Sequence, residues 1–285
     1  MFAILKKQTL AKDIVLMDVL APRVAEAALP GQFVMVRTDE KGERIPLTIC
    51  DYNAASGAVT IVTQIVGASS RKICSLREGD TFADFVGPLG HPSELVRWAN
   101  DDLQRKQILF VAGGLGAAPV YPQLKWLHEH GAPADVIVGA KSSSLLILQP
   151  EMQAVTAKLY VATDDGSAGF HGLVTDLLKN LIDVQGKRYD MVIAIGPMVM
   201  MKFVALTAKT YGLPAVVSLN TLMVDGTGMC GACRVTVGGV TKFTCVEGPE
   251  FDGHLVDFDE ALRRQTMYRE QEREADCRCL EKLGK

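Results

Sequence analysis

The sequence predicts an antiparallel β-barrel, then an α/β domain with a parallel sheet, then a small cysteine-rich segment. Three observations support this. Short β-branched runs separated by turn residues fill residues 1–98, apolar runs alternate with helical stretches over 99–220, and three cysteines lie among glycines in 221–250. A charged tail, 251–285, follows. We expect these four ranges to be the structural units of the chain.

Six short runs make up the expected barrel. They lie at residues 3–10, 13–20, 31–38, 45–52, 58–67 and 81–87. Turn-forming residues separate them, including Pro30-Gly31, Gly42 and Ser56-Gly57. Glycine permits positive φ at such breaks, and serine bonds to nearby backbone. This spacing is typical of an antiparallel barrel or sandwich, and we expect the barrel.

The second part reads as strands that alternate with helices. Strands are expected at residues 107–114, 135–140, 158–163, 190–196 and 215–220, with helices at 119–130, at 172–183 and between the last two strands. Continuous apolar strands between helices indicate a parallel sheet. Ligands bind such sheets at the carboxyl ends of the strands. The residues expected there are Gly113–Pro119, Thr163–Ser167 and Gly196–Met200.

The charged tail supports two interpretations. Its charges alternate in sign, as in a helix exposed to solvent, and the alternative is a helix that docks on a partner subunit. Cys277 and Cys279 form a Cys-x-Cys pair in this tail, and we assign them no chemistry.

Composition argues against several kinds of partner. The chain has 285 residues, with 30 lysines and arginines against 33 acidic residues and a formal net charge of −3. No overall positive field therefore favours nucleic acid or an anionic membrane. No run approaches the ~20 apolar residues that span a bilayer, and the first residues lack the features of a signal peptide. We expect a cytoplasmic protein that binds neither nucleic acid nor membrane.

A glycine-rich turn follows the first strand of the α/β part. The turn reads Gly-Gly-Leu-Gly-Ala-Ala-Pro and contains Gly113, Gly114, Gly116 and Pro119. Glycines let backbone approach a phosphate, and the helix N-terminus that follows supplies free N–H groups and a favourable dipole. Proline in the third glycine position breaks the standard dinucleotide pattern, so the motif alone leaves a structural turn open.

Three of the seven cysteines lie within sixteen residues. Cys230 and Cys233 share a glycine-rich loop, and Cys245 can return to them on a short hairpin. In a reducing compartment such clustering indicates metal or redox chemistry. One possibility is a tetrahedral zinc held by these three thiolates and a fourth ligand.

The order of the motifs resembles that of the ferredoxin-NADP reductase superfamily, which pairs an FAD-binding barrel with a nicotinamide-binding α/β domain. The motifs are Arg-Ile-Pro-Leu-Thr at 44–48, Val-Gly-Ala-Ser-Ser at 66–70, Gly-Pro-Leu-Gly at 87–90 and the turn at 113–119. The resemblance implies that a set of barrel residues binds FAD, with Thr48 as the catalytic residue near flavin N5. This set is Arg44, Pro46, Leu47, Thr48, Val62, Thr63, Gln64, Gly67, Ser69 and Ser70.

The same resemblance implies a nicotinamide dinucleotide site on the α/β part. Besides the glycine-rich turn, its residues would be Thr163, Asp164, Asp165, Gly166, Gly196, Pro197 and Met198. The two aspartates suit ribose hydroxyls. Lys141 and Ser142 could instead receive the 2′-phosphate of NADP(H). The resemblance favours NAD(H).

The cysteine spacing resembles the [2Fe-2S] segment of dihydroorotate dehydrogenase electron-transfer subunits, in which four cysteines are expected. Asp225 stands in the first position here. This pattern is similar to the small FAD-containing subunits of NADH-dependent reduced ferredoxin:NADP+ oxidoreductases, also called sulfide dehydrogenase beta subunits, in which one aspartate joins three cysteines. The implied ligands are therefore Asp225, Cys230, Cys233 and Cys245, and the change of ligand should alter the cluster potential.

Together these sites imply a converter of reducing equivalents. Nicotinamide exchanges a hydride, an iron-sulfur cluster carries one electron, and flavin can do both. The resemblance implies a larger flavin and iron-sulfur subunit as partner in a heterodimer, and ferredoxin through that complex. Three alternatives stay open: an electron-transfer subunit of dihydroorotate dehydrogenase, a stand-alone NAD(P)H:acceptor reductase, and a non-catalytic, zinc-stabilised assembly subunit.

Overall fold

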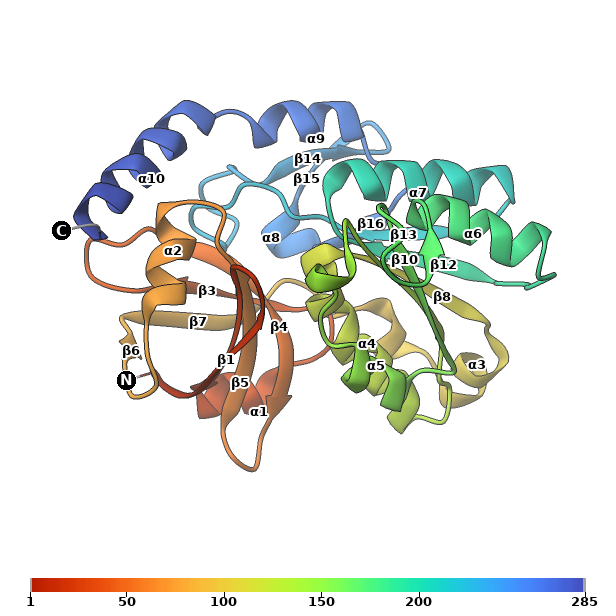
Figure 1. The fold of residues 1–285 in the computed structure, drawn as a ribbon, viewed down its shortest axis with the longest axis horizontal. Helices are drawn as coiled ribbons and strands as arrows, with labels where there is room; N and C mark the ends of the chain where they lie inside the picture. Colours follow the sequence, from red (N-terminus) through yellow and green to blue (C-terminus); the bar gives the residue numbers. More distant parts are fainter. Residues whose placement is uncertain (1, 284–285) are drawn as a thin grey trace.

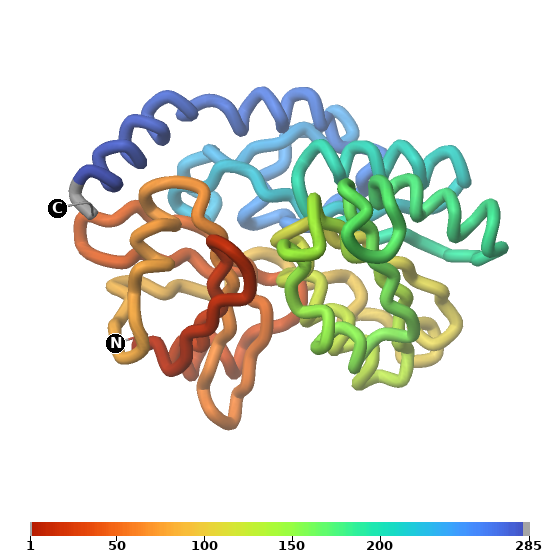
Figure 2. Tube along the Cα trace, viewed as in Figure 1, coloured from red at the N-terminus to blue at the C-terminus, as the bar shows by residue number. Residues whose placement is uncertain are grey.

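A computed structural model describes residues 2–283 and arranges them as a barrel lobe beside an α/β lobe (Figures 1 and 2). The barrel lobe holds one seven-stranded sheet, the α/β lobe holds a second, and a two-stranded hairpin lies near both. Within the described residues, no helix is both long and apolar enough to cross a membrane.

The barrel sheet has the order β6-β1-β2-β5-β4-β3-β7, and all its pairs are antiparallel. Its strands are β1 (Phe2–Ala11), β2 (Ile14–Leu20), β3 (Phe33–Arg37), β4 (Ile45–Asn53), β5 (Ala58–Gln64), β6 (Thr81–Phe82) and β7 (Asp84–Leu89). The edge strands β6 and β7 are separated only by Ala83, whose N–H donates to the carbonyl of Arg37. The ring is therefore nearly closed, which confirms the predicted barrel.

Strand alternation explains the barrel core. Inward residues such as Val19, Val34, Val59 and Ile61 are fully buried, and their neighbours in sequence point outward. Two short helices that the sequence did not predict cover this lobe: α1 (Pro22–Ala27) and α2 (Ala68–Ser75). Helix α2 buries Ile73 and Cys74 in the barrel core.

The α/β sheet has the order β11-β10-β9-β8-β12-β13-β16. Its strands are β8 (Ile108–Gly113), β9 (Asp135–Ala140), β10 (Lys158–Thr163), β11 (Phe170–His171), β12 (Met191–Ile195), β13 (Ala215–Ser218) and β16 (Glu250–Asp252). All pairs are parallel except β13 with β16, so the predicted parallel sheet is confirmed. The strand order reverses at β8, which creates a ligand-binding switch point between β8 and β12.

Helices cover both faces of this sheet. They are α3 (Asn100–Arg105), α4 (Ala117–Glu129), α5 (Gln149–Val155), α6 (Val174–Asp183) and α7 (Met198–Thr210). Helices α6 and α7 pack on one face, and α4 packs on the other together with barrel residues such as Ile14 and Val62. Helix α4 therefore lies at the junction of the two lobes, directly after the glycine-rich turn.

The C-terminal part connects both lobes. The predicted hairpin forms from β14 (Arg234–Val237) and β15 (Val240–Phe243) and is followed by α8 (Thr244–Glu247). Strand β16 then joins the α/β sheet. The charged tail forms α9 (Phe258–Gln265) and α10 (Arg269–Leu283), which arch back to the barrel (Figure 1).

Candidate functional site

The hairpin brings two of the three clustered cysteines together. Cys233 precedes β14 and Cys245 follows β15, and their Sγ atoms lie 3.2 Å apart in the interior. The carbonyl of Cys233 accepts hydrogen bonds from Thr244 Oγ1 at 2.9 Å and from the Thr244 backbone N–H at 3.2 Å. The base of the hairpin therefore fixes the distance between these two thiols.

Burial keeps the Cys245 thiol protonated in the absence of a cation. It raises the pKa of Cys245 to about 12, the adjacent Cys233 thiol and the charge of Cys230 act in the same direction, and the N–H of Gly228 opposes them. Thiolates form in such places when a metal ion supplies positive charge. The pair is thus suited to hold a metal or a metal cluster.

The other two predicted ligands lie on one loop, residues 225–233, which we call the cysteine loop. Cys230 is exposed. Asp225 is half-buried, and its Oδ2 accepts hydrogen bonds from the Thr227 backbone and hydroxyl and, at 3.4 Å, from the Met229 N–H. These bonds, first of all those from Thr227, hold the pKa of Asp225 below its ordinary value. The carboxylate is therefore ionised and caps its own turn.

The structure therefore assembles only half of the predicted ligand set. Among residues 2–283, no three histidine, cysteine, aspartate or glutamate side chains converge closely enough to hold a metal ion. Cys230 is nevertheless near enough to Cys245 to raise the pKa of that thiol. The buried thiol pair is thus preset, Cys230 lies close enough to interact with it, and Asp225 lies on the same glycine-rich loop as Cys230.

The cysteine loop rests directly on the barrel. A Cβ atom added to Gly226 would lie 2.6 Å from Met35 Cγ and 3.4 Å from Leu89 Cδ1, so only glycine allows this approach. Phe33, Met35 and Met223 form one apolar cluster with Cys233 and Cys245. The thiol pair therefore packs on β3, the strand next to β4, which carries the predicted flavin residues.

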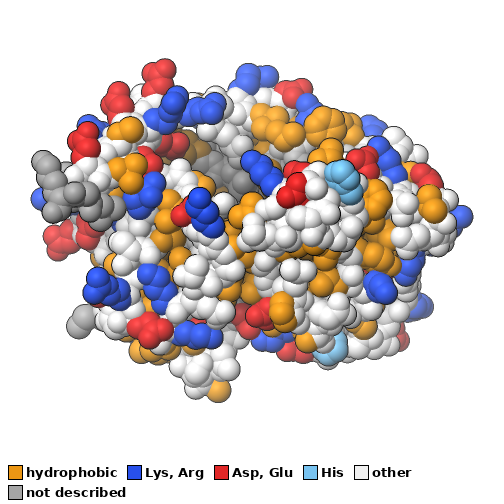
Figure 3. Space-filling model, viewed as in Figure 1, with side chains coloured by type: hydrophobic (Ala, Val, Ile, Leu, Met, Phe, Trp, Pro, Cys, Tyr) orange, Lys and Arg blue, Asp and Glu red, His pale blue; other side chains and the backbone are white. Residues whose placement is uncertain are grey.

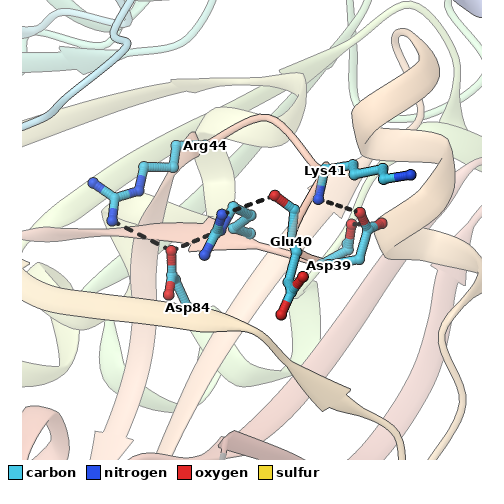
Figure 4. Close-up of polar contacts among 7 residues, drawn as sticks. Asp39, Glu40, Lys41, Arg44 and Asp84 are labelled. Atoms are coloured by element: carbon cyan, nitrogen blue, oxygen red, sulfur yellow. Dashed lines mark hydrogen bonds and ion pairs between the residues drawn. The ribbon is translucent and has the colours of Figure 1, made fainter.

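Those residues begin at Arg44, just before β4. Arg44 Nη2 donates to Asp84 Oδ2 at 3.3 Å, and Arg37 Nε lies 2.7 Å from the same oxygen (Figure 4). Partial burial raises the pKa of Asp84, but the two arginines outweigh it, so the pKa lies below its ordinary value. The turn beyond is closed by Asp39, whose Oδ1 accepts from the Lys41 N–H at 2.9 Å. Arg44 is thus exposed but held in place.

The middle of β4 and the end of β5 form one surface. Pro46, Leu47 and Thr48 are half-buried, and Thr48 pairs with Phe33 of β3. The pairing of β4 with β5 joins Ile49, the residue after Thr48, to Ile61, the residue before the predicted residues 62–64. Within the described chain, Thr63 Oγ1 is buried and has no hydrogen-bond partner. Thr63 is paired with Val15 of the barrel core, so this hydroxyl faces the barrel interior and not the surface of Thr48.

The start of α2 presents free backbone donors next to this surface. Ser70 Oγ accepts from the N–H groups of Val66 and Gly67 at 2.9 and 3.0 Å, so its hydroxyl caps the helix and is less available to a ligand than expected. Ser69 Oγ donates to Glu43 Oε2 at 2.5 Å. A Cβ added to Gly67 would meet no atom within 4 Å, so the approach is open. The first-turn amides are suited to an anion.

The two predicted glycine segments of the α/β sheet meet at the switch point. We call Gly113–Pro119 the β8 loop and Gly196–Met200 the β12 loop. A Cβ on Gly116 would overlap the carbonyl oxygen of Ile195, and one on Gly196 would lie 3.1 Å from Gly113 Cα. Gly114, in contrast, faces open space. These backbones therefore pack tightly on one side and leave the other accessible to a ligand.

The third predicted segment, Thr163–Ser167, is a closed turn. Thr163 is buried, and its Oγ1 both donates to and accepts from the backbone of Ala168, so its role is structural. Asp165 Oδ1 accepts from the Ser167 hydroxyl and backbone, and these bonds lower its pKa. Ser167 Oγ also accepts from the Ser143 N–H at 2.7 Å. Asp164 and Asp165 are exposed at the same edge as the β8 loop.

Two further polar contacts were not predicted from the sequence. Gln123 Nε2 of α4 donates to Glu250 Oε1 of β16 at 2.7 Å, where the two lobes meet. Arg71 of α2 pairs with Asp276 of α10 through two hydrogen bonds. Both join residues more than 100 positions apart, so no local pattern could have indicated them.

The chain is similar to known proteins, both in its cysteine-containing segment and over almost its whole length. Residues 220–257 match a family model described as the iron-sulfur cluster binding domain of dihydroorotate dehydrogenase B. A Thermotoga maritima protein named as a homolog of the dihydroorotate dehydrogenase B (NAD(+)) electron transfer subunit is 46% identical over 99% of this chain and 96% of its own length. An uncharacterized Clostridium beijerinckii protein from the adh 3′ region is 56% identical over 96% of this chain and 93% of its own length.

A solved structure is similar over almost the whole chain. It is described as that of the NADH-dependent reduced ferredoxin-NADP oxidoreductase, in a study of flavin-based electron bifurcation. It has a TM-score of 0.90 and 45% sequence identity, and the match covers 98% of each chain. Both lobes and the C-terminal segment therefore share one arrangement with that protein.

Proposed function

The chain belongs to the family of dihydroorotate dehydrogenase B electron-transfer subunits and their homologues, within the ferredoxin-NADP reductase superfamily, and on this basis we propose how it moves electrons. It is an oxidoreductase subunit of the flavin and iron-sulfur class. We propose that it exchanges hydride between NAD(H) and FAD and passes single electrons through a [2Fe-2S] cluster to a partner subunit.

One observation carries this proposal: the thiol pair packs beside the predicted flavin surface, on the same outer face of the barrel sheet. Phe33 of β3 pairs with Thr48 of β4 and also packs in the apolar cluster that contains Cys233 and Cys245. Gly226 brings the cysteine loop into contact with the same strand. The apolar side chains of β3 therefore connect the thiol pair with this surface and provide a dry path for an electron.

The barrel residues have distinct roles in this proposal. Bound FAD would supply the chemistry that accepts an electron pair and releases electrons singly. Arg44, held by Asp84, offers a charged donor for the pyrophosphate, and the first amides of α2 offer neutral ones. Pro46 and Leu47 provide an apolar surface for the ring, and the Thr48 hydroxyl orients the edge at which hydride arrives.

The α/β lobe would bind the nicotinamide dinucleotide. The β8 and β12 loops meet at the switch point, where their backbones leave an open side next to the N-terminus of α4. The ionised Asp165 and its neighbour Asp164 suit ribose hydroxyls and repel a 2′-phosphate. We therefore propose NAD(H) as the preferred nucleotide.

The cysteine loop would hold the cluster. Cys233 and Cys245 supply the buried ligands, and Cys230 and Asp225 supply the outer ones. Gly226 and Gly228 have φ values of 82° and 88°, a conformation that lets the loop turn tightly around a ligand. One carboxylate among three thiolates should set the potential apart from that of a four-cysteine site.

The exposed surface around this loop suits a partner protein. Met229 is 88% exposed, and Val224 and Val246 lie exposed nearby. An apolar surface next to a redox site marks an interaction face. We propose a heterodimer with a larger flavin and iron-sulfur subunit, in a complex that uses ferredoxin and NADP+. A dihydroorotate dehydrogenase subunit is the second candidate, and co-purification distinguishes the two.

Anaerobic purification tests the proposal. The protein should show flavin and iron-sulfur absorption and contain FAD, iron and acid-labile sulfide, and NADH should bleach the flavin more readily than NADPH. Cys233→Ser should remove the cluster absorption and leave the flavin. Cys277→Ser, which changes an exposed thiol on α10, is the matched control. Zinc without flavin, iron or sulfide would instead identify an assembly subunit.

A further inference from the structure

The C-terminal helices are anchored at one end to the cysteine loop. Arg264 Nη2 of α9 donates to the carbonyl oxygen of Ala232 at 3.0 Å, and Gln265 Nε2 donates to the carbonyl of Asn220 at 2.9 Å. Glu260 Oε2 accepts from the Thr236 N–H of the hairpin. Helix α9 also buries Phe258 and Ala261. The start of the tail is therefore firmly attached beside the thiol pair.

The other end of the tail is attached to the barrel. Asp276 of α10 accepts two hydrogen bonds from Arg71 of α2, at 3.0 Å from Nε and 3.1 Å from Nη2. Both side chains are about three-quarters buried, with exposures of 24% and 25%. The hydrogen bonds of this pair raise the pKa of Arg71 and lower that of Asp276, so both groups are charged. A bidentate arginine pair of this type fixes orientation as well as distance.

Between these anchors the tail passes over the space between the lobes. Figure 1 shows α9 and α10 arching from the β14–β15 hairpin to α2, and the space-filling view shows a recess between the lobes beneath them (Figure 3). The inner face of α2 is held in the barrel by Ile73 and Cys74, and Ser69 is held by Glu43. Helix α10 covers a further side of α2, one turn from its free amides.

We propose that α10 is part of the FAD site and that Asp276 is a positioning residue, which acts through Arg71 to hold α2 and to retain the bound dinucleotide. The inference rests on the proposed function, because it takes the start of α2 as the pyrophosphate site. In this role Asp276 does not touch FAD. It keeps the guanidinium of Arg71 engaged with α10 and keeps the arch closed over the recess.

A direct role of Arg71 in phosphate binding predicts the opposite effect on FAD release. If Arg71 served as a direct phosphate ligand that Asp276 merely restrains, removal of the carboxylate would free the guanidinium and tighten FAD binding. If α10 instead holds the site together, removal of the same carboxylate would speed FAD release. The sign of the effect separates the two.

The test measures FAD release from the full-length holoprotein by the rise in flavin fluorescence after strong dilution into flavin-free buffer. Asp276→Asn and Arg71→Gln should each speed release by about threefold to tenfold, the range expected for one hydrogen-bonded ion pair. The exchange of charges, Arg71→Asp with Asp276→Arg, should restore slow release. Glu274→Gln, which changes an exposed carboxylate on the same helix, is the control.

Thermal unfolding of the FAD-free variants adds a second readout. A positioning role predicts faster release with nearly unchanged unfolding temperature of the apoprotein. Unchanged or slower release from Asp276→Asn, or no recovery in the exchanged variant, would overturn the inference. If the wild-type protein takes up no FAD at all, the proposed function fails instead, and the two failures are thereby distinguished.

Discussion

Two regions of the molecule contain several glycines: the β8 and β12 loops, taken together, and the cysteine loop. Glycine has a different role in each region. In the first region Gly113, Gly116 and Gly196 let backbone pack on backbone, and the loops are complete without any ligand. In the cysteine loop Gly226 and Gly228 provide positive φ, and only one pair of predicted ligands is preset. One site is therefore preorganised by packing, and the other depends on what it binds.

The largest expected effect tests the preorganised region. Gly116→Ala would place a Cβ on the carbonyl oxygen of Ile195, which is backbone and cannot rotate away. Gly116 has an ordinary helical φ of −58°, so the cost is steric alone. We expect a loss of about 3 kcal/mol in the free energy of unfolding, measured by urea denaturation of the FAD-free protein.

Gly67→Ala is the control for this prediction. Its added Cβ meets no atom within 4 Å and its φ of −178° is extended, so its free energy of unfolding should hardly change. Equal effects of the two substitutions would show that the β8 loop is not held by close packing.

The next prediction concerns Glu250, which lies between the two regions. Its carboxylate is partly buried at the junction of the lobes, and this burial raises its pKa from 4.5 to about 7 although a hydrogen bond from Gln123 acts in the opposite direction. The folded state therefore holds a proton that the unfolded state loses above pH 4.5. The resulting stability is present in full below pH 4.5 and is lost as the pH rises through 7.

Glu250→Gln should remove this pH dependence. The variant should match the wild type near pH 4 and exceed its free energy of unfolding by about 2 to 3 kcal/mol at pH 8, because the amide stays neutral. Denaturation of the FAD-free protein across this range is the measurement. Glu94→Gln, an exposed neighbour, should keep the wild-type slope. A slope that persists in Glu250→Gln would assign the titration to another group.

The same contrast explains what the sequence could predict. The six barrel runs and the alternating strands and helices were recognisable because their periodicity is local, and their architecture is confirmed. The short helices α1, α2 and α5 were not, since six to eight residues carry little periodic signal. The last expected barrel run proved to be two strands, β6 and β7, separated by Ala83.

Long-range contacts were beyond sequence reasoning. The return of β16 to the α/β sheet joins Ser218 to Glu250, and Arg71 meets Asp276 across 205 positions. Motif order pointed to the two loops that meet at the switch point between β8 and β12. It could not show that Thr163 and Ser70 use their hydroxyls within their own turns, which depends on hydrogen bonds that only the folded loop reveals.

The smallest expected effect tests the outer half of the cysteine loop, where Asp225 has two possible roles. Its Oδ2 accepts bonds from Thr227 and Met229 and so shapes the turn, and it is also a predicted cluster ligand. Asp225→Asn keeps an acceptor oxygen for the turn but removes the anionic ligand, whereas Asp225→Ala removes both.

If ligation of the cluster is the main role of Asp225, both variants should alter the cluster absorption and lose part of the iron, while Cys233→Ser loses nearly all of it. If the turn dominates, Asp225→Asn should retain the wild-type spectrum and iron content, and only Asp225→Ala should change. Iron counting with anaerobic absorption spectra decides between the two, and wild-type values for both variants would exclude Asp225 from the site.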